Sequence, residues 1–295
     1  MHRRQMLRYL AAGTCVAALG SPRRAISGRT FAAVPKSVWV WRTPLSESAE
    51  LRQLVREHDF RTVFYSVPPA GRVSLFGGGK REEGAIQGFR EEGVSFYAVS
   101  GDPAWCRRGT QMPRAVAELL NFQKRGQLFD GLCLDVEPHT LPEWKTGARD
   151  QVAQGYLDLL GGIRQASLEI KLPLTAAMVP FYANHRAPGE TDESLLESAA
   201  ALVDEVVMMG YRDSPSNALR LAAKSLDQLD AADRPWWFGV STHQKAPQGV
   251  SYAGSNFDRF KAAMIEIDTH LGSHGRFYRG IAINDYPSLT TILRR

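Results

Sequence analysis

Two carboxylic acids stand two residues apart at the end of a short apolar segment, Asp135 and Glu137 in the sequence Gly-Leu-Cys-Leu-Asp-Val-Glu. Side chains alternate between the two faces of a β-strand, so a strand over 131–137 places both acids on one face, together with Cys133. Two carboxylates in a core are costly without partners or a function, and their repulsion makes one of them hold a proton near neutral pH. A protonated carboxylic acid beside an ionised one can cleave a glycosidic bond. The alternative is a structural pair whose charges are satisfied by a buried arginine or by backbone donors.

Eight short segments rich in β-branched and aromatic residues alternate with longer amphipathic segments after Pro35. This alternation, with strands too continuously apolar for a half-exposed sheet, predicts a parallel sheet with helices on its outside. Eight such units in about 250 residues match a (β/α)8 barrel, and we predict one such TIM barrel over 36–295. A doubly wound sheet is the alternative, although no glycine-rich phosphate loop follows the first strand. The expected strands are 37–41, 61–66, 94–99, 131–137, 172–178, 205–209, 236–241 and 280–283.

The active groups of such a barrel lie at the carboxyl ends of its strands, which reduces the chain to a short set of candidate site residues. Flat aromatic rings at these positions suit stacking against sugar rings. Asp102 is either a binding or catalytic carboxylate or a turn residue before Pro103. His139 fits a loop-positioning role better than metal binding, because no second histidine lies at ligand spacing. The candidate substrate-binding residues are Trp41, Asp102, Trp105, Trp144, Tyr182, Arg212, Asp213, Asp285 and Tyr286.

The segment that ends in Glu137 resembles the strand-four signature of family-18 glycoside hydrolases, the chitinases and endo-N-acetylglucosaminidases. Their pattern is DGxDxDxE, and this chain reads Asp-Gly-Leu-Cys-Leu-Asp-Val-Glu over 130–137. The resemblance implies that Glu137 is the general acid. It also implies that Asp135 orients an N-acetyl group of the substrate, whose oxygen attacks the anomeric carbon. Cys133 stands where the pattern has its middle Asp, which in the family shares the proton and charge of its neighbour.

A second segment fits the same family in part. The family's strand six ends in MxYD, whereas this chain reads Met-Gly-Tyr-Arg up to Arg212, with Asp213 one place later. By position, Tyr211 is implied as a donor to the reacting sugar. We expect Asp135 to stay ionised, with Arg212 as a candidate for balancing its charge, and to raise the pKa of Glu137. The family's strand-eight Trp is absent, and Asn-Asp-Tyr stands there over 284–286. The resemblance therefore implies a divergent relative of these barrel glycosidases.

The composition is that of an ordinary globular protein of 295 residues, with 44% hydrophobic and 23% charged residues. The net charge of +5 comes from the first 25 residues, which carry five arginines and no acid. The rest of the chain has 31 basic and 31 acidic residues. We therefore expect no nucleic-acid-binding surface.

The first residues have the features of an export signal. Arg3 and Arg4 precede a weakly apolar run that is about half the ~20 residues a membrane-spanning helix needs. We expect a removable twin-arginine signal over 1–25, a short linker over 26–35, and a periplasmic or secreted protein with no further segment able to span a membrane. The alternative is a misassigned start or a disordered basic tail. The two cysteines left after the signal form neither a disulfide framework nor a metal-site spacing.

Three functions are compatible with these features. The first is a secreted glycoside hydrolase that acts on a polysaccharide or glycan through Glu137, without a cofactor or metal. The second is a non-catalytic carbohydrate-binding barrel that keeps Glu137 for structure, which the replacements at Cys133 and Arg212 favour. The third is a metal-dependent phosphodiesterase or deacetylase, which needs converging ligands where the strand ends offer few histidines.

Overall fold

The strands pair in parallel and close on themselves in the computed structural model, which describes residues 29–41, 43–45, 48–67, 80–108, 111–126 and 128–295. Each strand pairs with the next one along the chain, and the first pairs with the last through the register of Lys36 with Ile281. The predicted (β/α)8 barrel is therefore confirmed, and the doubly wound alternative is excluded. The expected leader over 1–25 lies outside the described residues. The strands are β1 (Lys36–Val40), β2 (Thr62–Ser66), β3 (Ser95–Ser100), β4 (Gly131–Leu134), β5 (Leu174–Met178), β6 (Glu205–Met209), β7 (Trp236–Ser241) and β8 (Tyr278–Asn284).

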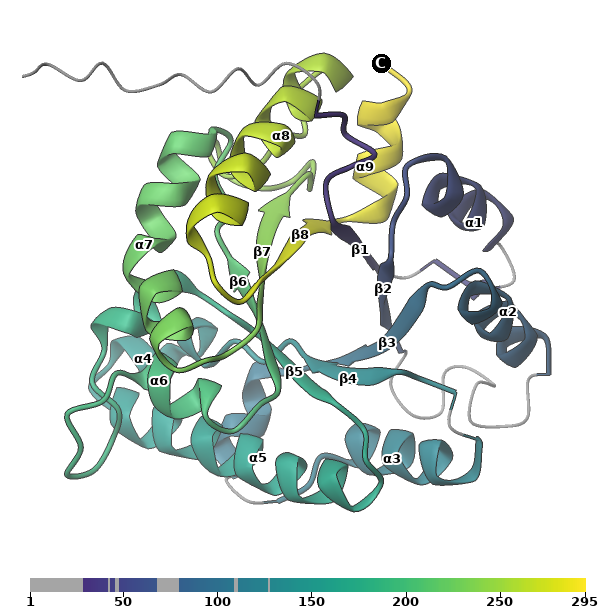
Figure 1. Ribbon diagram of the computed structural model, residues 1–295. Helices are drawn as coiled ribbons and strands as arrows, with labels where there is room; N and C mark the ends of the chain where they lie inside the picture. The colour runs from purple at the N-terminus through teal and green to yellow at the C-terminus, as the bar shows by residue number, and fades with distance from the viewer. Residues whose placement is uncertain (1–28, 42, 46–47, 68–79, 109–110, 127) are drawn as a thin grey trace, which may run out of the picture.

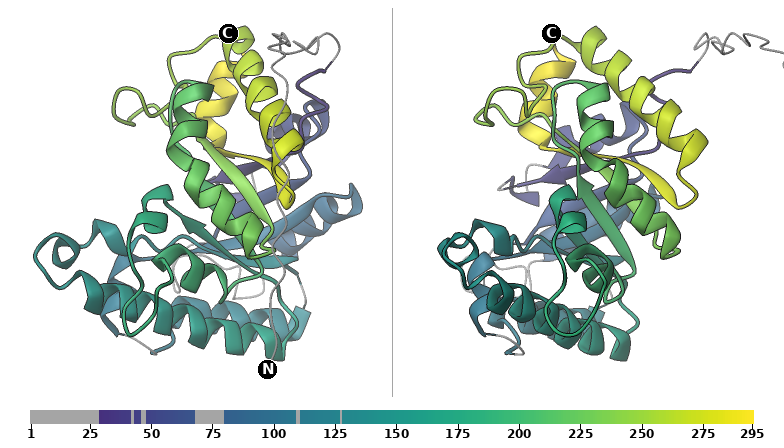
Figure 2. Two further views of the ribbon diagram at one scale, coloured as in Figure 1. Left: turned by 60° about the vertical axis from the view of Figure 1, so that its left-hand side comes forward. Right: turned by 90° about the vertical axis from the view of Figure 1, so that its left-hand side faces the viewer.

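Helices form the outer layer around these strands (Figure 1). The long helix α5 lies on the opposite side of the barrel from α8 and α9, as the further views show (Figure 2). Short 3-10 helices extend the connections after β3, β4 and β5. The helices are α1 (Ser48–Glu57), α2 (Lys80–Glu91), η3 (Pro103–Arg108), α3 (Arg114–Gly126), η4 (Pro138–Thr140), α4 (Pro142–Lys145), α5 (Arg149–Glu169), η5 (Pro180–Asn184), α6 (Leu195–Ala200), α7 (Pro215–Ala231), α8 (Phe257–His274) and α9 (Tyr286–Leu293). No helix among the described residues is both long enough and apolar enough to cross a membrane.

The barrel wall separates two apolar layers. Leu132, Leu134 and Val136 belong to the large cluster between the strands and the helices, whereas Cys133 belongs to the cluster inside the barrel. The alternation expected for this segment is therefore confirmed. The inner cluster consists of Trp39, Phe64, Val99, Cys133, Ala177, Val207, Met209, Trp237 and Ala282.

Strand β4 is shorter than expected. The sequence predicts a strand over 131–137, but the ladder ends at Leu134. Pro138 opens η4 and lacks the N–H that a ladder needs, and Glu137 before it has φ −112° and ψ 76°, outside the extended region. Asp135 still donates its backbone N–H to the Ser100 carbonyl at 3.0 Å. The two acids therefore leave the ladder at the carboxyl end of the barrel.

At the opposite end of the barrel, the segment that precedes β1 packs into the layer between the strands and the helices. Phe31 and Val34 are buried there. Lys36, also buried, donates from Nζ to three carbonyl oxygens of this segment, including Phe31 at 2.8 Å and Val34 at 2.9 Å. Arg29 contacts Asp268 of α8 at 2.5 Å. Residues 29–35 of the expected linker therefore pack against the barrel.

Candidate active site

A pocket of about 860 Å³ opens at the carboxyl end of the strands. Its walls come from the ends of β1, β4, β7 and β8, which is where a TIM barrel places its catalytic groups. Both candidate carboxylates are among its lining residues. The lining is Trp41, Thr43, Asp135, Glu137, His243, Lys245, Asn284, Asp285 and Pro287.

The position of Asp135 depends on a close approach between β3 and β4. Gly101 follows β3, and a Cβ atom there would lie 1.9 Å from the backbone oxygen of Asp135. Any side chain at Gly101 would therefore push the end of β4 away.

Asp130, directly before β4, holds the other end of this strand in place. Asp130 accepts from the Phe96 N–H at 2.7 Å and from Arg90 Nε at 3.1 Å.

The carboxylates of Asp135 and Glu137 have no partner of opposite charge among the residues that the structure describes. Across the described ranges, neither side chain accepts a hydrogen bond or forms an ion pair with the protein. Burial raises the pKa of Asp135 to about 7, and the charge of Glu137 adds to the shift. Burial also raises the pKa of Glu137. Both carboxyl groups therefore keep a proton to a higher pH than exposed carboxyl groups do, and a protonated carboxyl group is the state that acid catalysis requires.

The distribution of this proton differs from the sequence expectation. The sequence predicts that Asp135 stays ionised, balanced by Arg212, and that its charge raises the pKa of Glu137. Instead, burial and the charge of Glu137 raise the pKa of Asp135 to about 7. Arg212 donates to the Tyr211 carbonyl at 2.7 Å, and no ion pair between Arg212 and Asp135 occurs in the described part of the chain. Without a cation beside it, Asp135 is protonated more readily than a paired carboxylate would be.

Cys133 lies directly below Asp135 on the inner face of the barrel. Its thiol is fully buried, and burial together with the charges of Asp135 and Glu205 raises its pKa well above the usual range. A neutral thiol is a weak hydrogen-bonding group, so it neither repels Asp135 as a carboxylate would nor shares a proton with it. The segment 131–137 therefore carries two carboxyl groups and a neutral thiol where the family pattern has three acids.

Tyr211 is held by a hydrogen-bonded chain that links the end of β6 through Asn284 of β8 to Trp41 after β1. Asn284 Nδ2 donates to the Tyr211 hydroxyl at 3.1 Å, and Trp41 Nε1 donates to Asn284 Oδ1 at 2.9 Å. The Trp41 ring stacks on Trp39 with centroids 5.6 Å apart, which fixes its plane. Burial and the charge of Asp135 raise the pKa of Tyr211, so its phenol stays protonated. The structure thus brings Trp41 and Tyr211 to the carboxylate pair.

Asp285 reaches the same pocket from the start of α9. Its Oδ1 caps the helix by accepting from the Ser288 N–H at 3.1 Å, and its Oδ2 lies 3.5 Å from His243 Nδ1. The backbone of Asp285 is held on both sides by Thr242, which donates to its carbonyl at 3.0 Å and accepts from its N–H at 2.9 Å. Asp285 therefore has a fixed position in the pocket wall, and one of its carboxylate oxygens is already used to cap α9.

The loop aromatics predicted from the sequence gather on another side of the mouth. Tyr182 is 1% exposed, and its hydroxyl pairs with His139 Nδ1 at 2.9 Å, so it supports the loop and presents no free surface to a sugar. Trp144 packs against Tyr182 and His185, with centroids 5.8 and 5.6 Å away. Burial and Lys145 lower the pKa of His139 to about 4, so this imidazole is neutral. The loop-positioning role expected for His139 agrees with these contacts.

Other candidates lie outside the pocket lining. Asp102 accepts from the Ala104 N–H at 2.8 Å and starts η3, which is the turn alternative expected from the sequence. Trp105 on η3 is partly buried against the outer core. Asp213 donates its backbone N–H to the Gly249 carbonyl at 3.1 Å.

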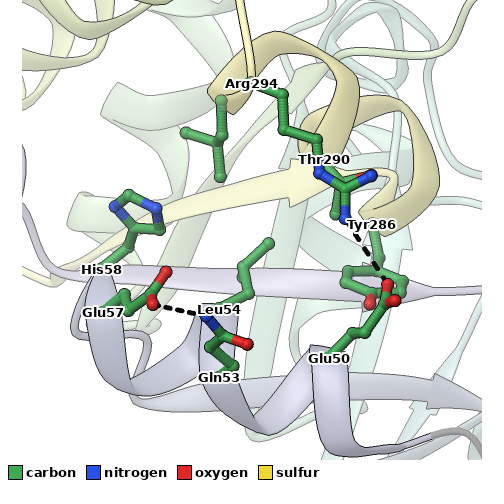
Figure 3. Close-up of a pocket in the computed structure, with 9 residues that line it drawn as sticks. Glu50, Gln53, Leu54, Glu57, His58, Tyr286, Thr290 and Arg294 are labelled. Atoms are coloured by element: carbon green, nitrogen blue, oxygen red, sulfur yellow. Dashed lines mark hydrogen bonds and ion pairs between the residues drawn. The ribbon is translucent and has the colours of Figure 1, made fainter.

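Tyr286 does not face the site, in contrast to the sequence expectation. Because Asp285 caps α9, Tyr286 becomes the first residue of that helix and its ring turns to the outside of the barrel. There it lines a separate groove of about 220 Å³ between α1 and α9, with Glu50 and His58 (Figure 3). An ion pair between Arg294 and Glu50, 3.6 Å apart, crosses this groove. The helix cap at Asp285 therefore places the Tyr286 ring on the outer face of the barrel.

The pocket also contains residues that were not selected from the sequence. Asn284 is the central member of the chain to Tyr211, and His243, Lys245 and Thr43 line the wall. The sequence signal for Asn284 was its place at the end of a strand, directly before an Asp-x-x-Ser helix start. Nowhere in the described ranges do three or more His, Cys, Asp or Glu side chains gather as a group that could hold a metal ion.

Comparisons with known proteins agree with this architecture. No protein-family model and no curated protein matches the sequence. Among solved structures, a GH18 chitinase from Pseudoalteromonas aurantia matches with a TM-score of 0.56 and 12% identity over 88% of this chain and 99% of its own. The GH18 chitinase ChiB from Flavobacterium johnsoniae matches with a TM-score of 0.55 and 12% identity over 86% and 88%. The spore cortex-lytic enzyme SleL of Bacillus cereus matches with 0.53 and 12% over 88% and 73%.

These identities are low, and the likeness concerns the arrangement of the backbone. It agrees with the resemblance read from the acidic segment of β4. The chain therefore has a family-18 chitinase-like TIM-barrel fold, carried by a divergent sequence.

Proposed function

We propose that this protein is a glycoside hydrolase in which Glu137 is the general acid and Asp135 is the neighbouring carboxyl group that exchanges a proton with it. The observation that supports this most strongly is the pair of carboxyl groups in the pocket at the carboxyl end of the barrel, which has no charged partner among the described residues. A buried carboxylate without a partner costs stability, and a functional site is where such a cost is retained.

The proposed reaction begins with the pair carrying one proton. Glu137, at the outer position, gives a proton to the glycosidic oxygen as the bond to the anomeric carbon breaks. When Glu137 is ionised, Asp135, which lies deeper in the barrel, holds the shared proton. When Glu137 is protonated, Asp135 is ionised and supplies negative charge. The Tyr211 hydroxyl is the proposed neutral donor to the bound sugar, since its pKa is raised and it keeps its proton.

The substrate panel follows from the similar structures. Two of them are named as chitinases and the third as a spore cortex-lytic enzyme. We therefore propose a polysaccharide or glycan substrate, with chitin and spore cortex as the first materials to test.

A non-catalytic carbohydrate-binding barrel is the second candidate function. The neutral thiol of Cys133, in place of an acid, favours it because one acid of the expected set is missing. Restoring that acid with Cys133→Asp is expected to raise activity on N-acetylated glycans if the site is a modified family-18 site.

The test of the enzyme proposal is Glu137→Gln, which keeps the size of the side chain and removes the proton donor. Loss of a general acid costs about 10²–10⁴-fold in rate, so release of reducing ends should fall by that factor while glycan binding is kept. The matched control is Glu143→Gln, because Glu143 is an exposed acid of the neighbouring helix α4 that pairs with Arg107 at 2.6 Å. Equal turnover by wild type and Glu137→Gln would refute the proposal.

Export by the twin-arginine route is a separate proposal that rests on the sequence of residues 1–25. Replacing Arg3 and Arg4 by lysine should retain the folded protein inside the cell. Unchanged appearance of the protein outside the inner membrane would contradict it.

A further inference from the structure

Asn284 bridges two side chains that lie far apart in the sequence, Trp41 and Tyr211. It is the last residue of β8, its Oδ1 accepts from Trp41 Nε1 at 2.9 Å, and its Nδ2 donates to the Tyr211 hydroxyl at 3.1 Å. The amide is partly buried, and it shares the pocket with Asp135 and Glu137.

The chemistry of the three groups fixes the orientation of this amide. An indole N–H can only donate, so the atom of Asn284 that faces Trp41 has to be the carbonyl oxygen. The NH2 group must then face Tyr211, and it can only donate. The Tyr211 oxygen is therefore the acceptor of this hydrogen bond, and its own proton is directed elsewhere.

The Tyr211 hydroxyl lies beside the pocket that holds the candidate carboxylates. It is 3.1 Å from Asn284 Nδ2, and Asn284 lines this pocket together with Asp135 and Glu137. Within the described part of the chain, the hydroxyl donates to no protein acceptor. The ring fits because Gly239 lies beneath it: a Cβ at Gly239 would be 3.1 Å from Tyr211 Cε1.

We propose that Asn284, held by Trp41, is a positioning residue that obliges Tyr211 to donate its proton into the pocket, to an oxygen of the bound glycan. This inference deepens the proposed function and rests on it for the identity of the acceptor. The direction of the hydrogen bond itself rests on the chemistry of the three side chains alone.

Asn284→Asp tests the direction of the bond with almost no change in shape. At pH 8 the new carboxylate can only accept, so it competes with the glycan for the Tyr211 proton. At pH 4 the protonated acid can donate to Tyr211 as the amide did. We expect chito-oligosaccharide binding to be weaker by about 10-fold at pH 8 and close to that of the parent at pH 4.

The comparison is made in the Glu137→Gln background, so that no glycan is consumed. Asp135, Asp285, His243 and Lys245 also face this pocket and titrate or carry charge. Their contribution cancels when each affinity is divided by that of the Glu137→Gln parent at the same pH.

Asn284→Leu is the matched control, since it keeps the volume and removes both hydrogen bonds. Its loss of affinity should be the same at both pH values, and Tyr211→Phe should behave likewise. If Asn284→Asp loses the same factor at both pH values, Asn284 only fills space and the proposal is overturned.

Trp41→Phe provides a second route that leaves residue 284 untouched. Without the indole donor the amide can turn and offer its oxygen to Tyr211, so affinity should fall by a smaller factor, about 3-fold. Unchanged affinity would contradict the role given to Trp41.

A readout without glycan separates this inference from the proposed function. The 13Cζ resonance of Tyr211, assigned by its absence in Tyr211→Phe, reports whether the phenol donates or accepts. Asn284→Asp at pH 8 should move it toward the position of a phenol that donates to a carboxylate. If no glycan binds but the resonance moves, the proposed function fails and the direction of the hydrogen bond stands. If glycan is cleaved and the resonance does not move, the inference on Asn284 fails alone.

Discussion

Buried charged side chains have partners at one end of the barrel and lack them at the other, among the residues that the structure describes. At the amino end, Lys36 donates to three carbonyl groups, and Asp268 contacts Arg29 at 2.5 Å and accepts from Tyr278 at 3.0 Å. At the carboxyl end, the acids of the pocket pair have no such partners within the described residues.

The difference distinguishes buried charges that stabilise the fold from buried charges that are available for chemistry. A buried ion surrounded by fixed partners stabilises one arrangement and loses its reactivity. A buried carboxylate without partners costs stability and keeps a proton that it can give away. Substitutions at the carboxyl end should therefore change rate, and substitutions at the amino end should change stability.

Asp135→Asn should have the largest effect of the substitutions that separate the two ends. It removes the group that exchanges the proton with Glu137, so kcat/KM should fall by about 10²–10⁴-fold. The melting temperature at neutral pH should not fall, because an uncompensated charge has been removed. Steady-state kinetics and thermal unfolding of the same preparation check both parts. A fall in stability with normal turnover would place Asp135 with the structural charges.

Lys36→Met should show the converse. The substitution leaves two buried carbonyl groups and one part-buried carbonyl group without this donor, and the free energy of unfolding should fall by about 3 kcal/mol. The turnover number of the protein that remains folded should stay within about 2-fold of wild type. Urea unfolding and active-site-normalised kinetics measure the two effects. If Lys36→Met unfolds at the wild-type urea concentration, the amino end does not depend on this charge.

The pH dependence of stability gives an intermediate effect. Asp135 has a pKa raised from 3.8 to about 7 in the folded state, so the native protein binds more protons than the unfolded chain between these values. Stability from this group is therefore lost as pH rises from about 4 to about 7. The melting temperature of Asp135→Asn minus that of wild type should grow over this range. A constant difference would mean that the pKa of Asp135 is not raised.

Tyr286→Phe should have the smallest effect. The ring lies in the groove between α1 and α9, away from the pocket, and the substitution keeps its packing (Figure 3). Turnover and glycan affinity should stay within about 2-fold of wild type. A loss comparable to that of Tyr211→Phe would contradict the position of the ring.

The sequence was sufficient for the barrel and for the acidic pair, because both depend on local periodicity. Alternation along β4 placed Cys133 inside and its leucine neighbours outside, as the structure has them. The length of β4 was overestimated, because the effect of Pro138 on the residues before it was not taken into account.

The directions of single side chains could not be read from periodicity. Tyr286 faces outward because Asp285 starts a helix, and Tyr182 is turned inward by its bond to His139. Asn284 gains its role from two residues that lie 243 and 73 positions away in the chain. Such contacts depend on the closure of the barrel and have no local sequence signal.

The pH–rate profile for glycan cleavage, measured for wild type and Glu137→Gln with the same oligosaccharide, tests the role of the carboxylate pair most directly. We expect a wild-type rate that falls on the alkaline side as the pair loses its shared proton near pH 7, where the pKa of Asp135 lies. We expect Glu137→Gln to bind the same glycan and to show no such limb above a background rate. Wild-type protein that binds the glycan and does not cleave it at any pH, or a variant with the wild-type profile, would contradict this role.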